Sequence, residues 1–321
     1  MTTRKRILPK LRTLVARPST SKSSPTVTRP AKPAIPVLVA TDASHAAGAA
    51  VKFARGMADK GLWAPEALTV IEHLPIAVAE VALPPVPAFS EPEISQGVVS
   101  AVKRQLRRFG GATWRLSVQF GSAAHSIVTQ ARQQGAELIV LGLGRHGKLA
   151  RLLGAETVTR VCRLSDTPVL AIDTNASPII WTALVAVDFG ESSVRAARAA
   201  LSLLHDGGHL HLVHVRWALD GQTLHDPAWE RTYELGVEHA LARLERELAT
   251  EGIKITSEMR TGNVVETLLK AAKTIDADVI AAGSHSQTVM DRMLMGSTPA
   301  QLLRAAKCSV LVAPPESTQD A

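Results

Sequence analysis

Aromatic residues are scarce in this 321-residue chain, where phenylalanine, tryptophan and tyrosine together make up 3% of the sequence. This scarcity argues against functions in which exposed rings stack on nucleic-acid bases. Only two cysteines occur, Cys162 and Cys308, and neither lies in a CxxC or Cys/His cluster, so neither a disulfide scaffold nor a zinc site is expected. The longest apolar stretch, Ala77 to Phe89, is too short for a bilayer and is interrupted by Glu80, so no membrane span is expected.

Acidic residues are absent before Asp42, whereas nine lysine and arginine residues occur among residues 1–33. Their charge exceeds the whole net charge of +7, so the rest of the chain is not basic and no specific nucleic-acid partner is expected. The segment is also rich in serine, threonine and proline, which predicts a disordered tail. A solvated leader, an electrostatic tether to anionic surfaces and a transit-like peptide all fit this composition. The fold prediction therefore starts at Ala34.

From Ala34 onward, short apolar or β-branched runs alternate with longer helical patterns. Such alternation is typical of βαβ units, in which helices cover both faces of a parallel sheet. In the first half it predicts strands at residues 37–40, 68–71, 115–119, 138–141 and 169–172. It predicts an alanine-rich helix ending near residue 60 and further helices at residues 91–109, 123–133 and 157–163. The first half is thus predicted to be one five-stranded α/β unit.

The same order then begins again in the second half. The run Leu184–Asp188 repeats Leu38–Asp42 in kind, and an offset of 141 residues carries Gly142 onto Gly283 without a gap. Two unrelated domains would not hold register over such a length. The predicted fold is therefore α/β, with two tandem five-stranded parallel-sheet Rossmann-like domains. Their expected bounds are residues 34–175 and 180–315, flanked by tails at 1–33 and 316–321.

A glycine-rich pattern follows the fourth predicted strand of the second half. There, Ala277–His285 leads to Leu294–Thr298 and then to Ala306–Val312. This spacing resembles the signature of the universal stress protein family, in which a strand ends at glycine, two residues precede a second glycine, and nine more precede a glycine followed by serine or threonine. The resemblance covers nearly all of residues 34–315. It implies an adenine-nucleotide alpha-hydrolase-like fold and a sensor or regulatory module of the stress response.

In ATP-binding members of that family the triphosphate lies in the glycine-rich loop, and the adenosine lies near the acid that ends the first strand. The resemblance therefore implies ATP, with or without Mg²⁺, as a ligand of the second domain. The residues that it implies are Asp188, Val215, Gly283, Ser286, Gly296, Ser297 and Thr298. Ser286 departs from the family pattern, because it stands where the second glycine is expected and its Cβ would hinder a close approach of phosphate.

Elementary chemistry favours an anion at this place without the resemblance. Ligands of open parallel sheets lie at the carboxyl ends of the strands, and Gly283 marks such an end. Gly296 and Ser297 would open a helix, whose unpaired N–H groups and dipole attract an anion. Two simpler interpretations stay open, with Ser297 or Thr298 as an ordinary helix cap and Asp188 as an ordinary turn residue.

The first half departs further from the pattern. Under the same offset, Gly296 aligns with Ala155 and Ser297 with Glu156, which would put a carboxylate beside the phosphates. Shifting the loop by one residue aligns Gly154 with Gly296 but leaves Ala155 at the serine position. The corresponding candidates in the first domain are Asp42, Gly142 and Gly154. We expect this site to be degenerate and the nucleotide to bind mainly to the second domain.

No catalytic motif accompanies the pattern, since GxSxG, HExxH, P-loop and kinase signatures are all absent. His209 and His211 are predicted to share one strand face and His214 to lie on the other, but no carboxylate or cysteine at supporting spacing indicates a metal site. Catalytic and metal-binding residues are therefore not assigned, and any ATP hydrolysis is expected to be slow. A nucleotide-independent scaffold for a protein or small apolar ligand and a weak ATPase are the alternatives.

The final strand of each half offers a pairing surface. An exposed edge strand invites pairing, and universal stress protein domains commonly dimerise through this element. Because two copies in one chain can satisfy each other, we expect residues 169–172 to pair with residues 310–313 in an intramolecular pseudo-dimer. The pseudo-dimer leaves room for a further homodimer and for a protein partner whose identity the sequence does not indicate. We also expect a cytoplasmic location.

Overall fold

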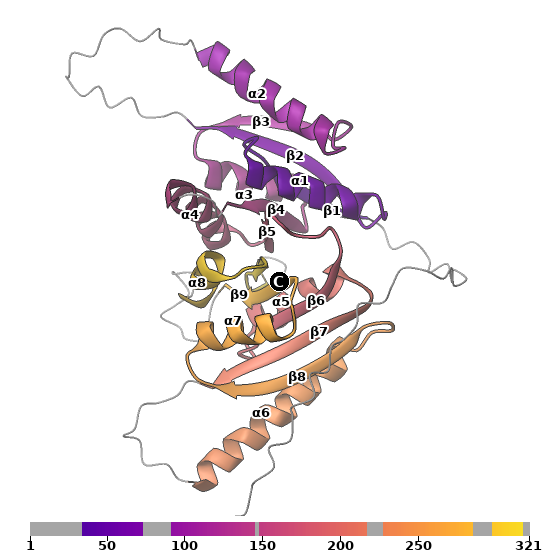
Figure 1. The fold of residues 1–321 in the computed structure, drawn as a ribbon, viewed down its shortest axis with the longest axis vertical. Coiled ribbons are helices and arrows are strands. Elements are labelled where there is room, and N and C mark those ends of the chain that lie inside the picture. The colour runs from indigo at the N-terminus through magenta and orange to yellow at the C-terminus, as the bar shows by residue number, and fades with distance from the viewer. Residues whose placement is uncertain (1–33, 73–90, 145–147, 217–226, 285–296, 317–321) are drawn as a thin grey trace, which may run out of the picture. The chain divides into compact units, whose positions relative to one another are not determined.

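The computed structural model describes residues 34–72, 91–144, 148–216, 227–284 and 297–316. Within these residues the first copy alternates strands and helices as predicted (Figure 1). Its strands are β1 (Ile35–Ala40), β2 (Trp63–Ile71), β3 (Leu116–Phe120), β4 (Leu138–Leu143) and β5 (Val169–Asp173). Its helices are α1 (His45–Ala58), α2 (Glu91–Arg108), α3 (Ala123–Gln133) and α4 (Lys148–Leu164).

The second copy repeats this order element by element within the described residues. Its strands are β6 (Ile180–Ala186), β7 (Leu204–Arg216), β8 (Lys254–Thr261), β9 (Val279–Gly283) and β10 (Ser309–Ala313). Its helices are α5 (Glu191–Leu203), α6 (Pro227–Leu248), α7 (Val264–Thr274) and α8 (Ser297–Ala305). The tandem α/β fold expected from the sequence is confirmed.

Two elements of the first copy are longer than predicted. Helix α4 begins nine residues before the expected Thr157. Strand β2 begins at Trp63 rather than Leu68, although Pro65 lies within it. In that stretch β2 pairs only with β1, and pairing with β3 begins at Ala67. The backbone N–H groups of alternate strand residues point toward opposite neighbouring strands. At Pro65 an N–H would point to the side of β2 that β3 does not yet cover, so its loss breaks no hydrogen bond of the sheet and proline is tolerated there.

The ten strands form one sheet in the order β3-β2-β1-β4-β5-β10-β9-β6-β7-β8. All neighbouring pairs are parallel except β5 and β10, which are antiparallel, with Leu311 opposite Leu170. This confirms the predicted pairing of the two final strands. The hydroxyl of Ser309 also accepts a hydrogen bond from the backbone N–H of Asp173 at 3.2 Å. The two copies therefore share one continuous sheet.

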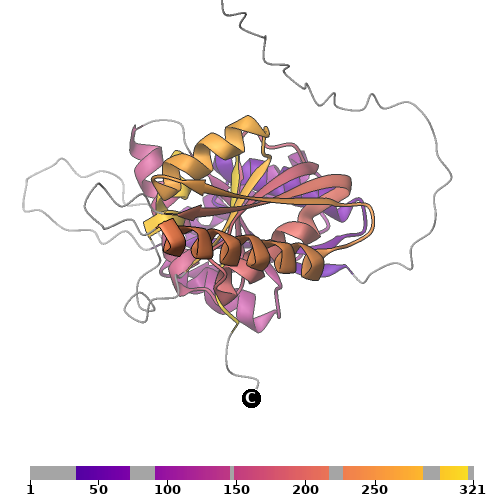
Figure 2. The same cartoon turned by 90° about the horizontal axis from the view of Figure 1, so that it is seen from below.

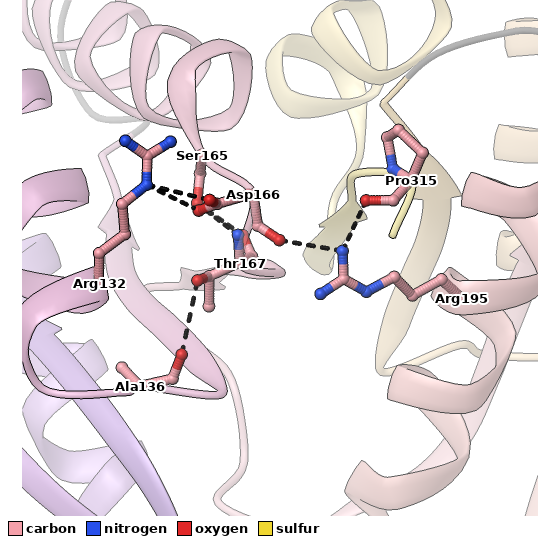
Figure 3. Close-up of polar contacts among 7 residues, drawn as sticks. All are labelled: Arg132, Ala136, Ser165, Asp166, Thr167, Arg195 and Pro315. Carbon is pink, nitrogen blue, oxygen red and sulfur yellow. Dashed lines mark hydrogen bonds and ion pairs between the residues drawn. The ribbon is translucent and has the colours of Figure 1, made fainter. Parts of the chain in front are cut away.

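Arg195 of α5 reinforces this junction between the copies. Its Nη1 donates to the backbone carbonyl oxygens of Asp166 at 2.9 Å and Pro315 at 2.8 Å (Figure 3). The same atom donates to the carbonyl oxygen of Pro314 at 3.2 Å. On the other side of the same loop, the Asp166 carboxylate pairs with Nε of Arg132 from α3 at 3.0 Å. The guanidinium group of Arg195 thus joins three segments that lie far apart in the sequence, namely α5, the loop at Asp166 and the residues after β10.

Helices cover both faces of the sheet. Successive strand residues point to opposite faces, so Val37 and Val185 pack with the side chains of α1, α2, α5 and α6, whereas Leu38 packs with those of α3, α4, α7 and α8. Figure 2 shows α6 and α7 on opposite sides of the strands. Burial on both faces explains the uninterrupted apolar runs of the strands. Among the described helices, none is both long and apolar enough to span a bilayer.

Candidate functional site

The candidate site of the second copy is built on the tight turn that follows β6. The backbone N–H of Gly190 donates to Oδ1 of Asp188 at 2.9 Å, and the hydroxyl of Ser193 accepts from the N–H of Asp188 at 3.4 Å. The Asp188 side chain is thus a turn former, as one interpretation of the sequence held. Asp188 is exposed, and a carboxylate that accepts one such bond retains acceptor capacity for a ligand.

The first copy has the same turn after β1. The backbone N–H of Ser44 donates to Oδ1 of Asp42 at 2.9 Å, and Ser44 then caps α1 by accepting from the N–H of Ala47 at 3.2 Å. In both turns the residue after the acid has a left-handed backbone, with φ of 63° at Ala43 and 64° at Phe189. That conformation costs a residue with a Cβ about 1–2 kcal/mol. Because both copies adopt it, the fold itself imposes the strain.

Gly283 and Gly142 lie where the first helix of each copy passes closest to the sheet. A Cβ on Gly283 would lie 2.9 Å from the backbone carbonyl carbon of Ser192, in the first turn of α5. A Cβ on Gly142 would lie 2.5 Å from the backbone nitrogen of Ala47 in α1. Such distances are shorter than van der Waals contact, so both glycines are required by helix packing. That packing brings the end of β9 against the helix that follows the Asp188 turn.

The glycine-rich loop is only partly described. Ser297 and Thr298 are the first residues of α8, as expected for residues that open a helix. Ser286 and Gly296 lie outside the described residues. In the first copy Gly154 lies inside α4, six residues after the helix begins, and not in the loop before it. A residue within a helix has its backbone N–H committed to the helix, so Gly154 does not supply a loop cradle.

Val215, which was expected beside Asp188, is half-buried near the end of β7 and packs on the side chains of the α7 face. The neighbouring His214 points to the opposite face, as the alternation predicted. Its Nδ1 lies 2.8 Å from the carbonyl oxygen of Val187 and its Nε2 lies 2.9 Å from the hydroxyl of Tyr233. A neutral ring satisfies both contacts when Nδ1–H donates to the carbonyl and the tyrosine hydroxyl donates to Nε2.

Sequence reasoning missed an aromatic column beside this turn. The ring of Phe189 stacks on His214 at 5.0 Å, His214 lies 6.4 Å from Tyr233, and Tyr233 stacks on Trp229 at 5.5 Å. Trp229 is 62% exposed. The spacing of Trp229 and Tyr233 by four residues at the start of α6 was a usable signal, because such residues meet on one helix face. In a chain with so few aromatic residues, this gathering marks the second copy as chemically different from the first.

The described residues contain no cluster of three or more histidine, cysteine, aspartate or glutamate side chains arranged to hold a metal ion. The charged groups near the column are Arg216 at the end of β7 and two glutamates of α6. Arg216 Nη1 lies 3.9 Å from Glu230 and 3.8 Å from Glu234. This part of the site can therefore orient a planar or polar ligand, but it offers no preformed metal centre.

Comparison with known proteins finds one family model that matches two separate ranges of the chain. The model of the universal stress protein family matches residues 36–173 and again residues 182–314. The two matches together cover most of the described residues, and each contains one first-strand turn and one of the glycines that packs against the following helix.

Individual relatives agree. A universal stress protein of Mycobacterium bovis is 26% identical over 231 residues, which is 66% of this chain and 76% of that protein. One from Methanocaldococcus jannaschii is 32% identical over 88 residues, which is 26% of this chain and 52%, or about half, of the relative's own length. Among solved structures, a universal stress protein from Archaeoglobus fulgidus superposes with a TM-score of 0.64 at 21% identity, over 88% of this chain and 98% of the other. This structural likeness shows the fold.

Proposed function

Since this chain belongs to the universal stress protein family, we propose that its second copy binds ATP and that occupancy of this site regulates the protein's interactions under stress. The observation that carries the proposal is the packing of the Asp188 turn, through Ser192 of α5, against Gly283 at the carboxyl end of β9. Open parallel sheets bind ligands in the crevice at this end of their strands. The turn offers a carboxylate that can accept hydrogen bonds from ribose hydroxyls.

The phosphates would lie at the start of α8. Ser297 and Thr298 open this helix, whose first N–H groups and positive dipole end favour an anion, and their hydroxyls can donate further hydrogen bonds. These groups fit a triphosphate. Magnesium would arrive with the nucleotide, because the described residues hold no cluster for it. When bound, Mg²⁺ supplies positive charge that offsets phosphate repulsion.

The choice of the second copy rests on the contrast with the first. In α4 of the first copy, Ala155 and Glu156 occupy the aligned positions of Gly296 and Ser297, so a carboxylate replaces a hydroxyl. The first copy also has Ala43 where the second has Phe189 and its aromatic column. The rings beside the Asp188 turn and the hydroxyls at the start of α8, which the first copy lacks, therefore favour the second copy as the proposed nucleotide site.

A nucleotide-independent scaffold is the second candidate, and one observation favours it. Helix packing alone accounts for Gly283, and turn formation alone accounts for Asp188, so neither residue requires a ligand. Hydrolysis has weaker support still, because no general base or arginine finger for it is identified, and such an arrangement is expected to hydrolyse ATP slowly at best.

Isothermal titration with Mg-ATP tests the proposal. We expect wild-type protein to bind and Ser297→Glu to lose about tenfold or more in affinity, because the new carboxylate would meet the phosphates. A negative charge in the first turn of a helix is favourable for the helix, so this variant should fold normally. Asp188→Asn should weaken binding, whereas the matched Asp42→Asn in the first copy should not. Absence of binding to the wild type would leave the scaffold as the function.

A further inference from the structure

A connected chain of polar side chains runs along β7 and β8, apart from the candidate nucleotide site. Nε2 of His209 and Nδ1 of His211 each lie 2.7 Å from the same atom, the hydroxyl oxygen of Thr256. Nε2 of His211 lies 2.8 Å from Oε1 of Glu258. That oxygen also accepts from Nε of Arg260 at 2.7 Å. We call these five residues the proton chain.

At the centre of the proton chain, the hydroxyl of Thr256 has only one proton to donate to its two imidazole neighbours. The single hydroxyl proton of Thr256 can point to only one of the two imidazoles, so the other imidazole must donate to the oxygen. Since Nε2–H of His211 donates to Glu258, a neutral His211 accepts at Nδ1, and His209 then donates from Nε2. Both histidines are neutral in this state, and every contact is a hydrogen bond.

One added proton preserves all of these contacts. A proton on Nδ1 of His211 turns that atom into a donor, the Thr256 hydroxyl then turns toward His209, and His209 accepts at Nε2 while its own proton moves to Nδ1. A second proton is less favourable. The two lone pairs of the Thr256 oxygen can accept from both imidazoles, but two charged rings then face one oxygen and the hydroxyl proton loses its imidazole acceptor.

The charged surroundings also oppose a second proton. On β8, Lys254 lies opposite His209, and Lys254 and Arg260 already outnumber Glu258, the only acid of that strand. Strand β6, the other neighbour of β7, has no charged residue. The carboxylate of Asp278 beside β6 accepts from the backbone N–H groups of Trp181 and Thr182. The charged residues of α7 on this face are exposed, namely Glu266, Lys270 and Lys273, and the first two pair with each other at 3.6 Å.

The ionisation of two members agrees with this account. Burial lowers the pKa of His209, and the nearby positive groups His211 and Lys254 lower it further. Burial works against the charge of Glu258, but hydrogen bonds from Arg260 and His211 outweigh it and lower the pKa of that carboxyl. The acid therefore stays ionised while the histidine resists protonation.

We propose that the proton chain is an acid-sensing site, which holds one added proton with its hydrogen bonds intact and loosens the edge strand β8 when a second proton places two charged rings against the hydroxyl of Thr256. Among the residues that the structure describes, strand β8 is the last strand of the sheet and pairs with β7 alone, so no second described strand holds it in place. The direction of the pH dependence of stability follows from the pKa of His209. Its folded pKa is lowered, so its contribution to stability is complete above the unfolded pKa of about 6.5 and is lost as the pH falls below it.

The first copy supplies an internal control. Leu38 and Leu184 are equivalent positions, and they lie opposite Glu66 and His211 respectively, so Glu66 stands where His211 stands. Glu66 accepts from the side chain of Gln134 at 2.6 Å. Strands β2 and β3 contain no histidine. Among the described residues, these two strands therefore lack an imidazole, the side chain whose ordinary pKa lies near neutrality.

Hydrogen exchange of ligand-free protein at about pH 7.5 and about pH 5.5, corrected for intrinsic rates, tests the proposal. Local opening of β8 should increase at the lower pH, by roughly twofold or more, and opening of β3 should stay unchanged. His209→Gln removes the second protonation and should abolish most of the increase. His239→Gln, which changes an exposed histidine of α6, should keep the wild-type response.

Two results would overturn the acid-sensing site. One is parallel loss of protection in β8 and β3, and the other is an unchanged pH response in His209→Gln. Imidazole NMR titration of the wild type gives a check that does not depend on a variant folding. It should show the pKa of His209 below the ordinary value of an imidazole, and a His209 pKa at or above that value would contradict the acid-sensing site. Neither experiment involves nucleotide, so the result is independent of ATP binding.

Discussion

The two copies place different chemistry on the same backbone. After the first-strand acid, Ala43 and Phe189 share a left-handed conformation, yet only Phe189 belongs to an aromatic column. On the strand next to each edge of the sheet, Glu66 of β2 bonds to a glutamine, whereas the equivalent His211 of β7 belongs to the proton chain. The backbone geometry is therefore a property of the fold, and the chemistry belongs to the individual copy. Substitutions at matched positions can test this division.

The largest contrast should come from the two packing glycines. Gly142→Ala pushes a Cβ into the backbone of α1, which cannot move aside, and we expect a loss of about 3 kcal/mol in the free energy of unfolding. In Gly283→Ala part of the clash is with the Ser192 side chain, so a loss of about 1–2 kcal/mol is expected. Urea denaturation of both variants measures the difference. Equal losses would show that the two helices approach the sheet equally closely.

A smaller effect is expected at the junction between the copies. Arg195→Ala removes the donor of three backbone carbonyls and should lower the free energy of unfolding by about 2 kcal/mol. Arg198, three residues after Arg195 in α5, makes an exposed contact with Glu316 at 3.8 Å. Arg198→Ala is the matched control and should change stability by less than about 0.5 kcal/mol, again measured by urea denaturation.

The smallest effect is expected at the left-handed residues. Ala43→Gly should stabilise the protein by about 0.5–1 kcal/mol, because glycine adopts a positive φ without strain. Phe189→Gly loses the ring contact with His214, but it should still be more stable than Phe189→Ala by about 1 kcal/mol. Thermal unfolding of the three variants gives the comparison. An Ala43→Gly variant that is less stable than wild type would show that the turn is not strained.

The repeat, the alternating elements and the pairing of the final strands could all be predicted from the sequence, because each leaves a periodic or register signal in neighbouring residues. The role of Gly283 could not, since Ser192 contacts it across 91 residues of sequence. The junction at Thr256 likewise depends on the register of β7 against β8, which no local pattern fixes. Of the residues chosen by family resemblance, Gly283 packs against the helix that follows the Asp188 turn, whereas Val215 lies on the other face from the aromatic column. Their role in binding a nucleotide stays a prediction.

The antiparallel contact between β5 and β10 joins two sets of parallel strands that run in opposite directions. Every strand of the first copy runs one way and every strand of the second runs the opposite way, so the carboxyl ends of the two sets lie on opposite rims. A ligand seated on one rim is out of reach of the loops on the other. The duplication therefore produces a body with two unlike ends, and the nucleotide site proposed for the second copy would be accessible only from the rim where the strands of that copy end.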